Sequence, residues 1–423
     1  MRARRRSTLA AREARLAFWM LAPTFLIVFA IVLFPVLANV WISAKAVKLA
    51  DLRPPRPVVR VRLLEPPSAP GDTLRLRYQM RNSSQSVTIT DVALFDRLPP
   101  GLVPVGLDPR CSFEAPRLAC ALGSWQGGAR ENLDLAFTAG QAYFDAGAPE
   151  PTEAATSIRG RAPNVLTNLR FTLANFRKVL SGTEFWPALR VTLAYTVFGT
   201  IGSILLGLFA AQLLNVSFVG KGALRGLFLF PYVAPVIAVA FTWAFLLDPL
   251  SGAVNALGQR FGVLGQAVAF LSQRSFTIEL FGLHLTLPLA LSSVIAFEAW
   301  RYFPFAFLFI LARFQAIPRD MYEAAEVDGA SPLQQFWYVT LPQLVGILST
   351  LFLLRFIWTF NKFDDIFLLT GGAAGTKTLT VQVYDEAFAL ADLGAGAAVA
   401  VVLFVVLAAF MVLYFRYAPE GEA

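Results

Sequence analysis

The sequence predicts a membrane all-α protein with six spanning helices and one β-sandwich inserted between the first and second of them. The chain is mostly apolar, with 56% hydrophobic and 15% charged residues, whereas soluble domains carry about 25% charged residues. Apolar windows recur that are long enough to cross a bilayer, which takes about 20 residues in a helix. After the first window, residues 47–184 are polar and show the alternation of strands.

The apolar windows mark the predicted spans. They lie at 17–42, 189–214, 226–247, 287–311, 343–360 and 396–415. Trp19 and Trp41 flank the first window, as interfacial aromatic residues flank spanning helices. In the second window Gly199, Ser203 and Gly207 recur every four residues. These small residues share one helix face and predict close packing against another helix rather than a ligand site.

Basic residues predict the orientation of the spans. The net charge is +8, and arginines crowd the N-terminal segment 1–16, at positions 2, 4, 5, 6, 12 and 15. Because basic residues stay on the cytoplasmic side of a membrane, both termini are expected in the cytoplasm. A basic arm that binds nucleic acid is the alternative. It is disfavoured because the first helix, 17–44, follows directly. This helix exceeds the roughly 7–15 apolar residues of a secretory signal, so a membrane span is expected. Membrane lipid, and not nucleic acid, is the expected partner.

The polar insert is predicted to form a β-sandwich at 56–140, followed by a linker and interfacial segment at 141–184. Its period-two runs lie at 58–63, 74–78, 87–90 and 133–137, and turn residues separate them. The predicted orientation places this insert outside the cytoplasm, where disulfides persist. Cys111 and Cys120 are therefore expected to be bonded, with two free buried thiols as the alternative. The run 90–102, these cysteines and 120–123 resemble immunoglobulin-like repeats of bacterial surface proteins, which implies a fold rather than an activity.

A predicted cytoplasmic loop at 313–342 has the features of a projecting helical loop that docks to a partner protein. Pro318 suits a helix start, and the acidic Asp320 and Glu323 favour the positive end of that helix. Gly329 permits a sharp turn or the close approach of a partner's backbone. A short helix, a bend, a second short helix and a return to the membrane at Pro342 are expected.

This loop also carries a family resemblance. Glu323-Ala324-Ala325, Gly329 and Val339-Thr340-Leu341-Pro342 stand at the spacing of the coupling loop of ABC importer permeases. The resemblance implies a type I core at 185–417 with five membrane helices besides the first, in a bacterial inner membrane. It implies as partners two ABC ATPase subunits, a second and different permease subunit, and an extracytoplasmic solute-binding protein. The residues expected to couple to the ATPase are Glu323, Ala324, Ala325, Asp328, Gly329, Leu341 and Pro342.

Further positions resemble carbohydrate importer permeases of the maltose type. They are Asn175-Phe176, Phe185-Trp186, the run 315–318, and the run 358–361 leading to 369–372. The usual glycine-rich continuation is replaced by Gly371-Gly372-Ala373-Ala374-Gly375. The β-domain also departs from that family, in which the large external domain follows a later span. The resemblance implies transport of a sugar, as a di- or oligosaccharide.

Polar residues inside the spans predict where the sugar binds. Glu298, Arg301 and Arg355 lie within apolar windows, although a charge at the bilayer centre costs about 2.5–3.5 kcal/mol. Glu298 and Arg301 stand three apart on one helix face, so a purely structural ion pair between them is the alternative. The predicted sugar-binding residues are Glu298, Arg301, Tyr302, Phe305, Trp358, Thr359 and Lys362. Three of these carry charges that the maltose-type pattern lacks.

The sequence lacks the residues of an ATPase or a metal site. Gly220-Lys221-Gly222 misses the first glycine and the hydroxyl residue of a phosphate-binding loop. His284 is the only histidine, without ligand neighbours at zinc-binding spacing. The chain is therefore expected to be a transport subunit without a cofactor, and ATP hydrolysis to belong to a partner. A membrane-anchored adhesion or scaffold protein leaves the coupling loop unexplained, and an ion-driven secondary transporter has no need of that loop.

Overall fold

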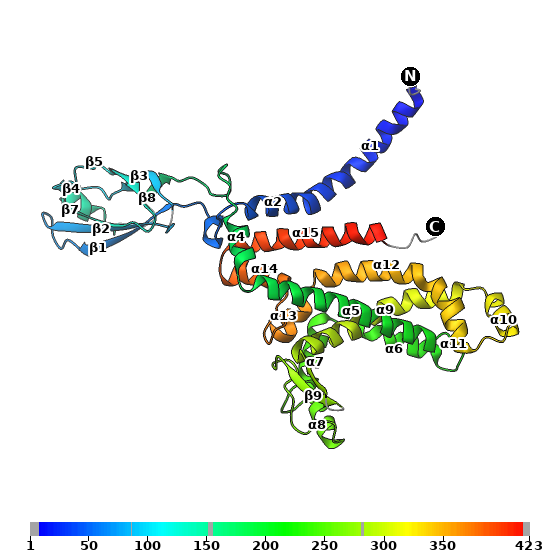
Figure 1. Ribbon diagram of the computed structural model, residues 1–423. Helices are drawn as coiled ribbons and strands as arrows, with labels where there is room; N and C mark the ends of the chain where they lie inside the picture. Colours follow the sequence, from blue (N-terminus) through cyan, green and yellow to red (C-terminus); the bar gives the residue numbers. More distant parts are fainter. Residues whose placement is uncertain (1–7, 86, 151–154, 281–282, 418–423) are drawn as a thin grey trace. The chain divides into compact units, whose positions relative to one another are not determined.

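The computed structural model describes residues 8–85, 87–150, 155–280 and 283–417. The chain divides into two compact units (Figure 1). A mainly helical unit contains Met1–Ala44, Leu173–Leu390 and Gly394–Ala423, and a β-rich unit contains Lys45–Thr172 and Ala391–Leu393. The insertion of the second unit in the chain thus begins directly after the first long helix.

The β-rich unit consists of two four-stranded sheets whose neighbouring strands pair antiparallel. The first sheet has the order β1 (Pro57–Glu65), β2 (Thr73–Asn82), β7 (Arg130–Ala139), β4 (Leu102–Val105). The second has the order β5 (Cys111–Glu114), β6 (Arg117–Trp125), β3 (Ile89–Arg97), β8 (Ser157–Arg161). Two short helices, η2 (Leu49–Leu52) and α3 (Gln141–Asp145), belong to the same unit.

Both sheets turn one face into a single apolar core. In β2 the buried residues Leu74, Leu76 and Tyr78 alternate with arginines, and they belong to one cluster with Leu94 of the second sheet. Inside this core the Tyr78 hydroxyl donates a hydrogen bond of 2.7 Å to the Asp96 carboxylate of β3. Burial, followed by the charge of Asp96, raises the pKa of this tyrosine. The sheets therefore share one core, as a sandwich does, while the immunoglobulin-like assignment stays a prediction.

The β-rich unit extends beyond the predicted boundary at residue 140. Strand β8 pairs with β3, with Ile158 opposite Leu94, so the segment expected to be a linker supplies the last strand of the second sheet. Cys111 and Cys120 stand opposite each other on β5 and β6 and are joined by a disulfide.

The helical unit contains the candidate membrane spans. Among the described residues, five helices are long and apolar enough to cross a membrane: Ala11–Ser43, Phe185–Leu213, Leu289–Ala316, Pro332–Phe360 and Leu393–Tyr417. The first comprises α1 (Thr8–Val28), a π-turn η1 (Phe29–Leu33) and α2 (Phe34–Ser43). The next two are α5 and α9, the fourth includes α12 (Leu341–Phe360), and the last is α15. Five of the six predicted windows thus fall on single long helices.

The predicted window 226–247 is not a straight helix. It contains α6 (Lys221–Val233) and α7 (Val236–Leu246), which meet at an angle of 95°. Pro235 causes the break, since proline lacks the N–H that would continue the helix and disfavours helical dihedrals in the residue before it. Ala234 accordingly has an extended ψ of 143°. Whether this bent pair crosses the membrane as a sixth span stays a prediction.

Shorter elements connect the long helices. They are α4 (Ala174–Ser181), α8 (Ala253–Arg260), the hairpin β9 (Phe276–Leu280) and β10 (Leu283–Leu287), α10 (Arg319–Val327), α11 (Pro332–Gln335), η3 (Phe336–Thr340), α13 (Asp364–Thr370), α14 (Leu379–Tyr384) and η4 (Asp385–Ala389). In Figure 1, α10 and α13 lie at opposite ends of the long helices α9 and α12. The elements predicted to couple to an ATPase thus lie at the end of the bundle opposite to α13 (Figure 1).

Small residues bring α5 and α9 into close contact, which confirms the packing predicted for the second span. A Cβ atom on Gly207 would lie 2.7 Å from the Cβ atom of Ala306 and 2.8 Å from the backbone nitrogen of Phe307. A Cβ atom on Gly199 would lie 2.9 Å from the Cγ atom of Glu298. The two helices approach each other this closely because these positions carry no side chain.

We predict opposite effects for the same substitution at two helical glycines. Gly207→Ala should lower the thermal unfolding temperature of the purified chain in lipid nanodiscs, because overpacking costs about 1–3 kcal/mol. Gly226→Ala in α6 is the matched control, since a Cβ atom there would meet nothing within 4 Å, and alanine favours a helix by about 0.5–1 kcal/mol. Equal shifts in the same direction would contradict the packing argument.

Candidate functional site

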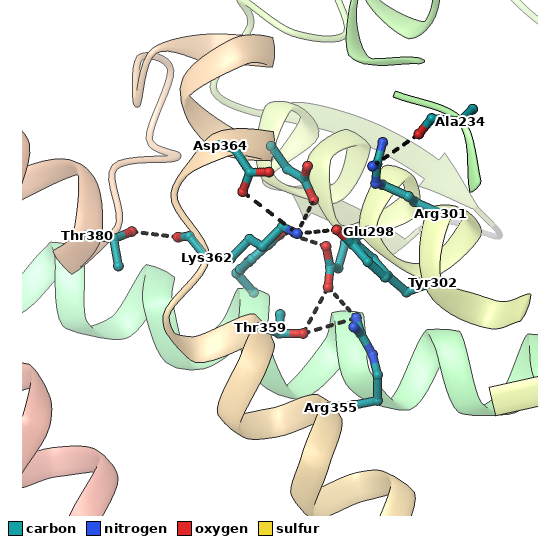
Figure 2. A network of polar contacts seen from close by, with 11 residues as sticks. Ala234, Glu298, Arg301, Tyr302, Arg355, Thr359, Lys362, Asp364 and Thr380 are labelled. Atoms are coloured by element: carbon teal, nitrogen blue, oxygen red, sulfur yellow. Dashed lines mark hydrogen bonds and ion pairs between the residues drawn. The ribbon is translucent and has the colours of Figure 1, made fainter. Parts of the chain in front are cut away.

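A fully buried carboxylate joins three long helices. Glu298 of α9 is 0% exposed and forms an ion pair with Arg355 of α12. Its oxygens also accept hydrogen bonds from Thr359 of α12 at 2.8 Å and from Tyr195 of α5 at 2.9 Å. Figure 2 shows the Arg355 and Thr359 contacts converging on this carboxylate. The bilayer penalty on an isolated charge explains why Glu298 lies inside protein with its oxygens satisfied.

Lys362, which follows the C-terminal end of α12, extends this network. The Lys362 ammonium contacts the Tyr302 hydroxyl and lies 3.6 Å from Asp365 and 3.7 Å from Asp364 (Figure 2). Its backbone carbonyl accepts a hydrogen bond of 2.6 Å from Thr380. Burial raises the pKa of Asp365, and the charge of Glu298 adds to the rise.

Arg301 does not pair with Glu298, so the alternative of a structural ion pair between these two residues is wrong, and Arg355 is the cation beside Glu298. The Nη2 atom of Arg301 reaches the backbone carbonyl of Ala234 at 3.5 Å (Figure 2). Its Nε and Nη1 atoms are buried without a hydrogen-bond partner among the described residues. The whole residue is only 7% exposed, so solvent does not replace these partners. The helix turns Arg301 toward the α6–α7 bend, and Arg355 from another helix takes the place beside Glu298.

Aromatic rings form a second, more accessible part of the site. The ring centroids of Phe305 and Trp358 lie 5.2 Å apart, and those of Tyr232 and Tyr302 lie 6.0 Å apart. Tyr232 links the two pairs, with its centroid 6.1 Å from that of Phe305. Trp358 is 46% exposed and Tyr232 is 40% exposed. We call these four residues the aromatic face; it combines side chains of α6, α9 and α12.

The structure thus sorts the seven predicted sugar-binding residues into different environments. Phe305 and Trp358 lie on the aromatic face, and Tyr302 joins that face to Lys362. We call the buried contacts among Glu298, Arg355, Thr359 and Tyr195 the ion network. Glu298 and Thr359 belong to it, and Arg301 lies apart from it. The prediction omitted Tyr195, Tyr232 and Asp365 from the site. Tyrosines and a carboxyl in or beside apolar segments were the available signals.

The residues predicted to couple to an ATPase are mostly exposed. α10 contains Glu323, Ala324 and Ala325 and ends before Gly329, whose φ of +77° turns the chain. α11 follows, and a capping box of Ser331 and Gln334 fixes its start. The expected order of short helix, bend and second helix is confirmed. Glu323, Ala324, Asp328, Gly329 and Pro342 are exposed, while Ala325 and Leu341 are partly buried.

Apolar side chains surround these coupling residues. Val327 is 88% exposed, Leu333 is 68% exposed and Tyr338 is 80% exposed. A hydrogen bond of 2.9 Å between the hydroxyls of Tyr322 and Thr340 holds α10 against the turn that precedes α12. Exposed apolar residues gathered on a braced helix pair are typical of a protein docking surface.

The chain is similar to known membrane transport proteins. Residues 203–420 match the family described as binding-protein-dependent transport system inner membrane component. The inner membrane ABC transporter permease protein YcjO of Escherichia coli K12 is 36% identical over 57% of this chain and 77% of its own. The trehalose/maltose transport system permease protein MalF of Thermococcus litoralis is 32% identical over 58% of this chain and 78% of its own.

A solved structure has a similar fold. It is a bacterial ABC transporter involved in the import of the acidic polysaccharide alginate, and one of its chains aligns with a TM-score of 0.50 at 22% identity. The alignment covers 60% of this chain and 86% of that one. At this identity the likeness indicates a shared fold of the helical unit.

We predict that Arg355→Met destabilises the chain in nanodiscs by about 3–5 kcal/mol, because it leaves the Glu298 carboxylate buried without its cation. The double variant Glu298→Met, Arg355→Met should recover most of this loss, since apolar residues can replace a buried pair at little cost. Arg313→Met is the control, because Arg313 lies on the exposed end of α9 and bonds to Gln343. Additive effects of the two network substitutions in thermal unfolding would refute the coupling.

Proposed function

Because this chain belongs to the family of binding-protein-dependent transport system inner membrane components, we propose that it forms one side of a sugar translocation path. The chain is a transport subunit of an ABC importer and not an enzyme, and ATP hydrolysis takes place on a partner subunit. The observation that carries the sugar proposal is the exposed aromatic face beside the polar groups of Tyr302 and Lys362.

The chemistry of the aromatic face suits a di- or oligosaccharide. Sugar rings have apolar faces that pack on aromatic side chains, and their hydroxyls need polar partners. Trp358 and Phe305 supply the first kind of contact, and Tyr302 and Lys362 supply the second. The name of MalF from Thermococcus litoralis, a trehalose/maltose transport system permease protein, supports the same substrate class. Glu298 and Thr359, which are buried, shape the site by holding α9 and α12 in register.

The exposed loop at 313–342 is the proposed contact with the ATPase. Its residues Glu323, Ala324, Ala325, Asp328, Gly329, Leu341 and Pro342 would dock in a groove of that subunit. Since α9 leads into the loop and α12 leads out of it, a push on α10 would reach both helices that hold the ion network. This connection gives the ATPase a mechanical route to the sugar site.

The proposed assembly contains further partners. Two ATPase subunits would bind, with a second, different permease subunit covering the open side of the aromatic face. An extracytoplasmic solute-binding protein would deliver the sugar. The arginines of 1–16, and Arg416 at the end of the last span, favour cytoplasmic termini in a bacterial inner membrane. The β-rich unit would then lie outside the cytoplasm, where the Cys111–Cys120 disulfide persists.

We predict that Trp358→Ala raises the KM for sugar uptake about tenfold or more, because apolar stacking worth about 1.5–3 kcal/mol is lost. Uptake should be measured in proteoliposomes that contain the complete importer with its solute-binding protein. Phe198→Ala is the control, since Phe198 is an aromatic residue of α5 that is 61% exposed and lies outside the aromatic face. Equal KM values for both variants and the wild type would remove Trp358 from the site.

We predict that Glu323→Ala and Gly329→Ala each reduce ATP-driven uptake severalfold without changing sugar affinity. The first removes an exposed carboxylate, and the second strains a turn whose φ of +77° favours glycine by about 1 kcal/mol. Glu326→Ala is the control, because Glu326 is an exposed carboxylate on the same helix. Normal uptake by both loop variants, or uptake by the wild type without ATP, would contradict the proposed coupling.

A further inference from the structure

The outer face of the first sheet in the β-rich unit carries a grid of arginines. Along β2, Arg75, Arg77 and Arg81 point away from the core, because they alternate with buried residues. The neighbouring strands add Arg60 and Arg62 on β1 and Arg130 on β7, each at a register position on the same face. We call these six residues the arginine face. It gives the domain a cationic surface on which few carboxylates are interspersed.

Two of these arginines stand directly opposite each other. Arg81 of β2 is the register partner of Arg130 of β7, and like charges in this arrangement destabilise a sheet. Elsewhere on the face the charge is offset, since Arg77 forms a bidentate ion pair with Asp134 and Arg75 lies 3.5 Å from Glu65. Within the described part of the chain, Arg81 and Arg130 have no ion-pair partner. The sheet therefore keeps an unfavourable pair that a bound anion would relieve.

The same pair lines a trough on this face. The trough has a volume of about 630 Å³, and Arg60, Arg81 and Arg130 border it together with Gln79 and Asn132. Gln79 and Asn132 are themselves register partners, so two side-chain amides lie one step along the strands from the two arginines. Arginine forks bind carboxylates with two parallel hydrogen bonds, and amides can both donate to and accept from hydroxyls. The volume lies within the range of small-molecule sites.

We propose that this trough binds an oligosaccharide whose sugars carry carboxylates. The proposal rests on the proposed function as a sugar importer and names the substrate class as acidic. Arg81 and Arg130 would share one carboxylate, Gln79 and Asn132 would bind hydroxyls of the same ring, and Arg60 would meet the next acidic group. An acidic ligand would also supply the anion that the buried Arg301 lacks on α9.

An acidic protein surface is the competing occupant of the arginine face. Protein interfaces concentrate their binding energy in buried aromatic and apolar anchors, whereas the trough is bordered by no aromatic residue among those that line it. Neighbouring strands lie about 4.8 Å apart, so arginines of adjacent strands are close enough to bind one shared carboxylate or two carboxylates of one ligand.

The test measures binding of oligogalacturonate to the full chain in lipid nanodiscs, with maltooligosaccharide of equal length as the neutral probe and polyglutamate as the acidic peptide probe. We expect the wild type to bind oligogalacturonate in preference to both other probes. Arg81→Gln, Arg130→Gln should weaken this binding about tenfold or more. The double variant should unfold at the same temperature or higher, because it removes a like-charge pair.

The matched control is Arg97→Gln, Arg117→Gln, which removes another opposed arginine pair, at the end of β3 and β6, where Glu114 also faces Arg117. It should change oligogalacturonate binding less than about twofold. Equal binding by all three proteins, or loss of polyglutamate binding alone in the Arg81 and Arg130 variant, overturns the proposal. If the complete importer takes up a neutral sugar but the chain does not bind oligogalacturonate, the proposal of an acidic ligand is overturned. The proposed function as a sugar importer then stands. Absence of ATP-driven sugar uptake instead removes the proposed function.

Discussion

The buried ion pair between Glu298 and Arg355 is the constraint around which the helical unit is arranged. In an apolar bundle a carboxylate without a cation would cost several kcal/mol, so α9 and α12 must meet at this level. Tyr195 brings α5 to the same carboxylate, and Gly199 lets α5 come near enough, since a Cβ atom there would meet Glu298. The small residues of one helix and the charges of two others therefore depend on one another.

The ion network and the aromatic face serve different needs of a transport site. The network is closed to solvent, and side chains of α5 and α12 bond to the oxygens of Glu298 on α9, so it resists rearrangement. The aromatic face is open, and its rings contact each other at their edges. A ligand can therefore replace one ring-to-ring contact with its own apolar surface without breaking a hydrogen bond. Tyr302 touches both, since its ring lies beside Arg355 and its hydroxyl contacts Lys362.

The sequence was sufficient to predict features that depend on local pattern. It was insufficient for features that depend on the direction in which a helix or a side chain points in the folded chain. Five spans, the coupling helices and the strand alternation follow from periodicity, composition and turn residues. The bend at Pro235 escaped a hydropathy window because such a window averages over direction, although the proline itself was a signal. Helical spacing placed Arg301 near Glu298, but 57 residues separate Glu298 from the cation that pairs with it, and spacing along one helix cannot reveal that partner. Strand β8 was missed because Ile158 is the one apolar side chain among its five residues, so no period-two alternation marks it.

The disulfide of the β-rich unit has a consequence for the edge of its second sheet. Strand β5 is an edge strand of only four residues, held beside β6 by a bond between register partners. Without that bond so short a strand would fray, and the nine-residue β6 would present its unpaired backbone groups to other chains. The covalent link keeps this longer strand covered, so this edge of the second sheet offers another chain only the four residues of β5 for strand pairing.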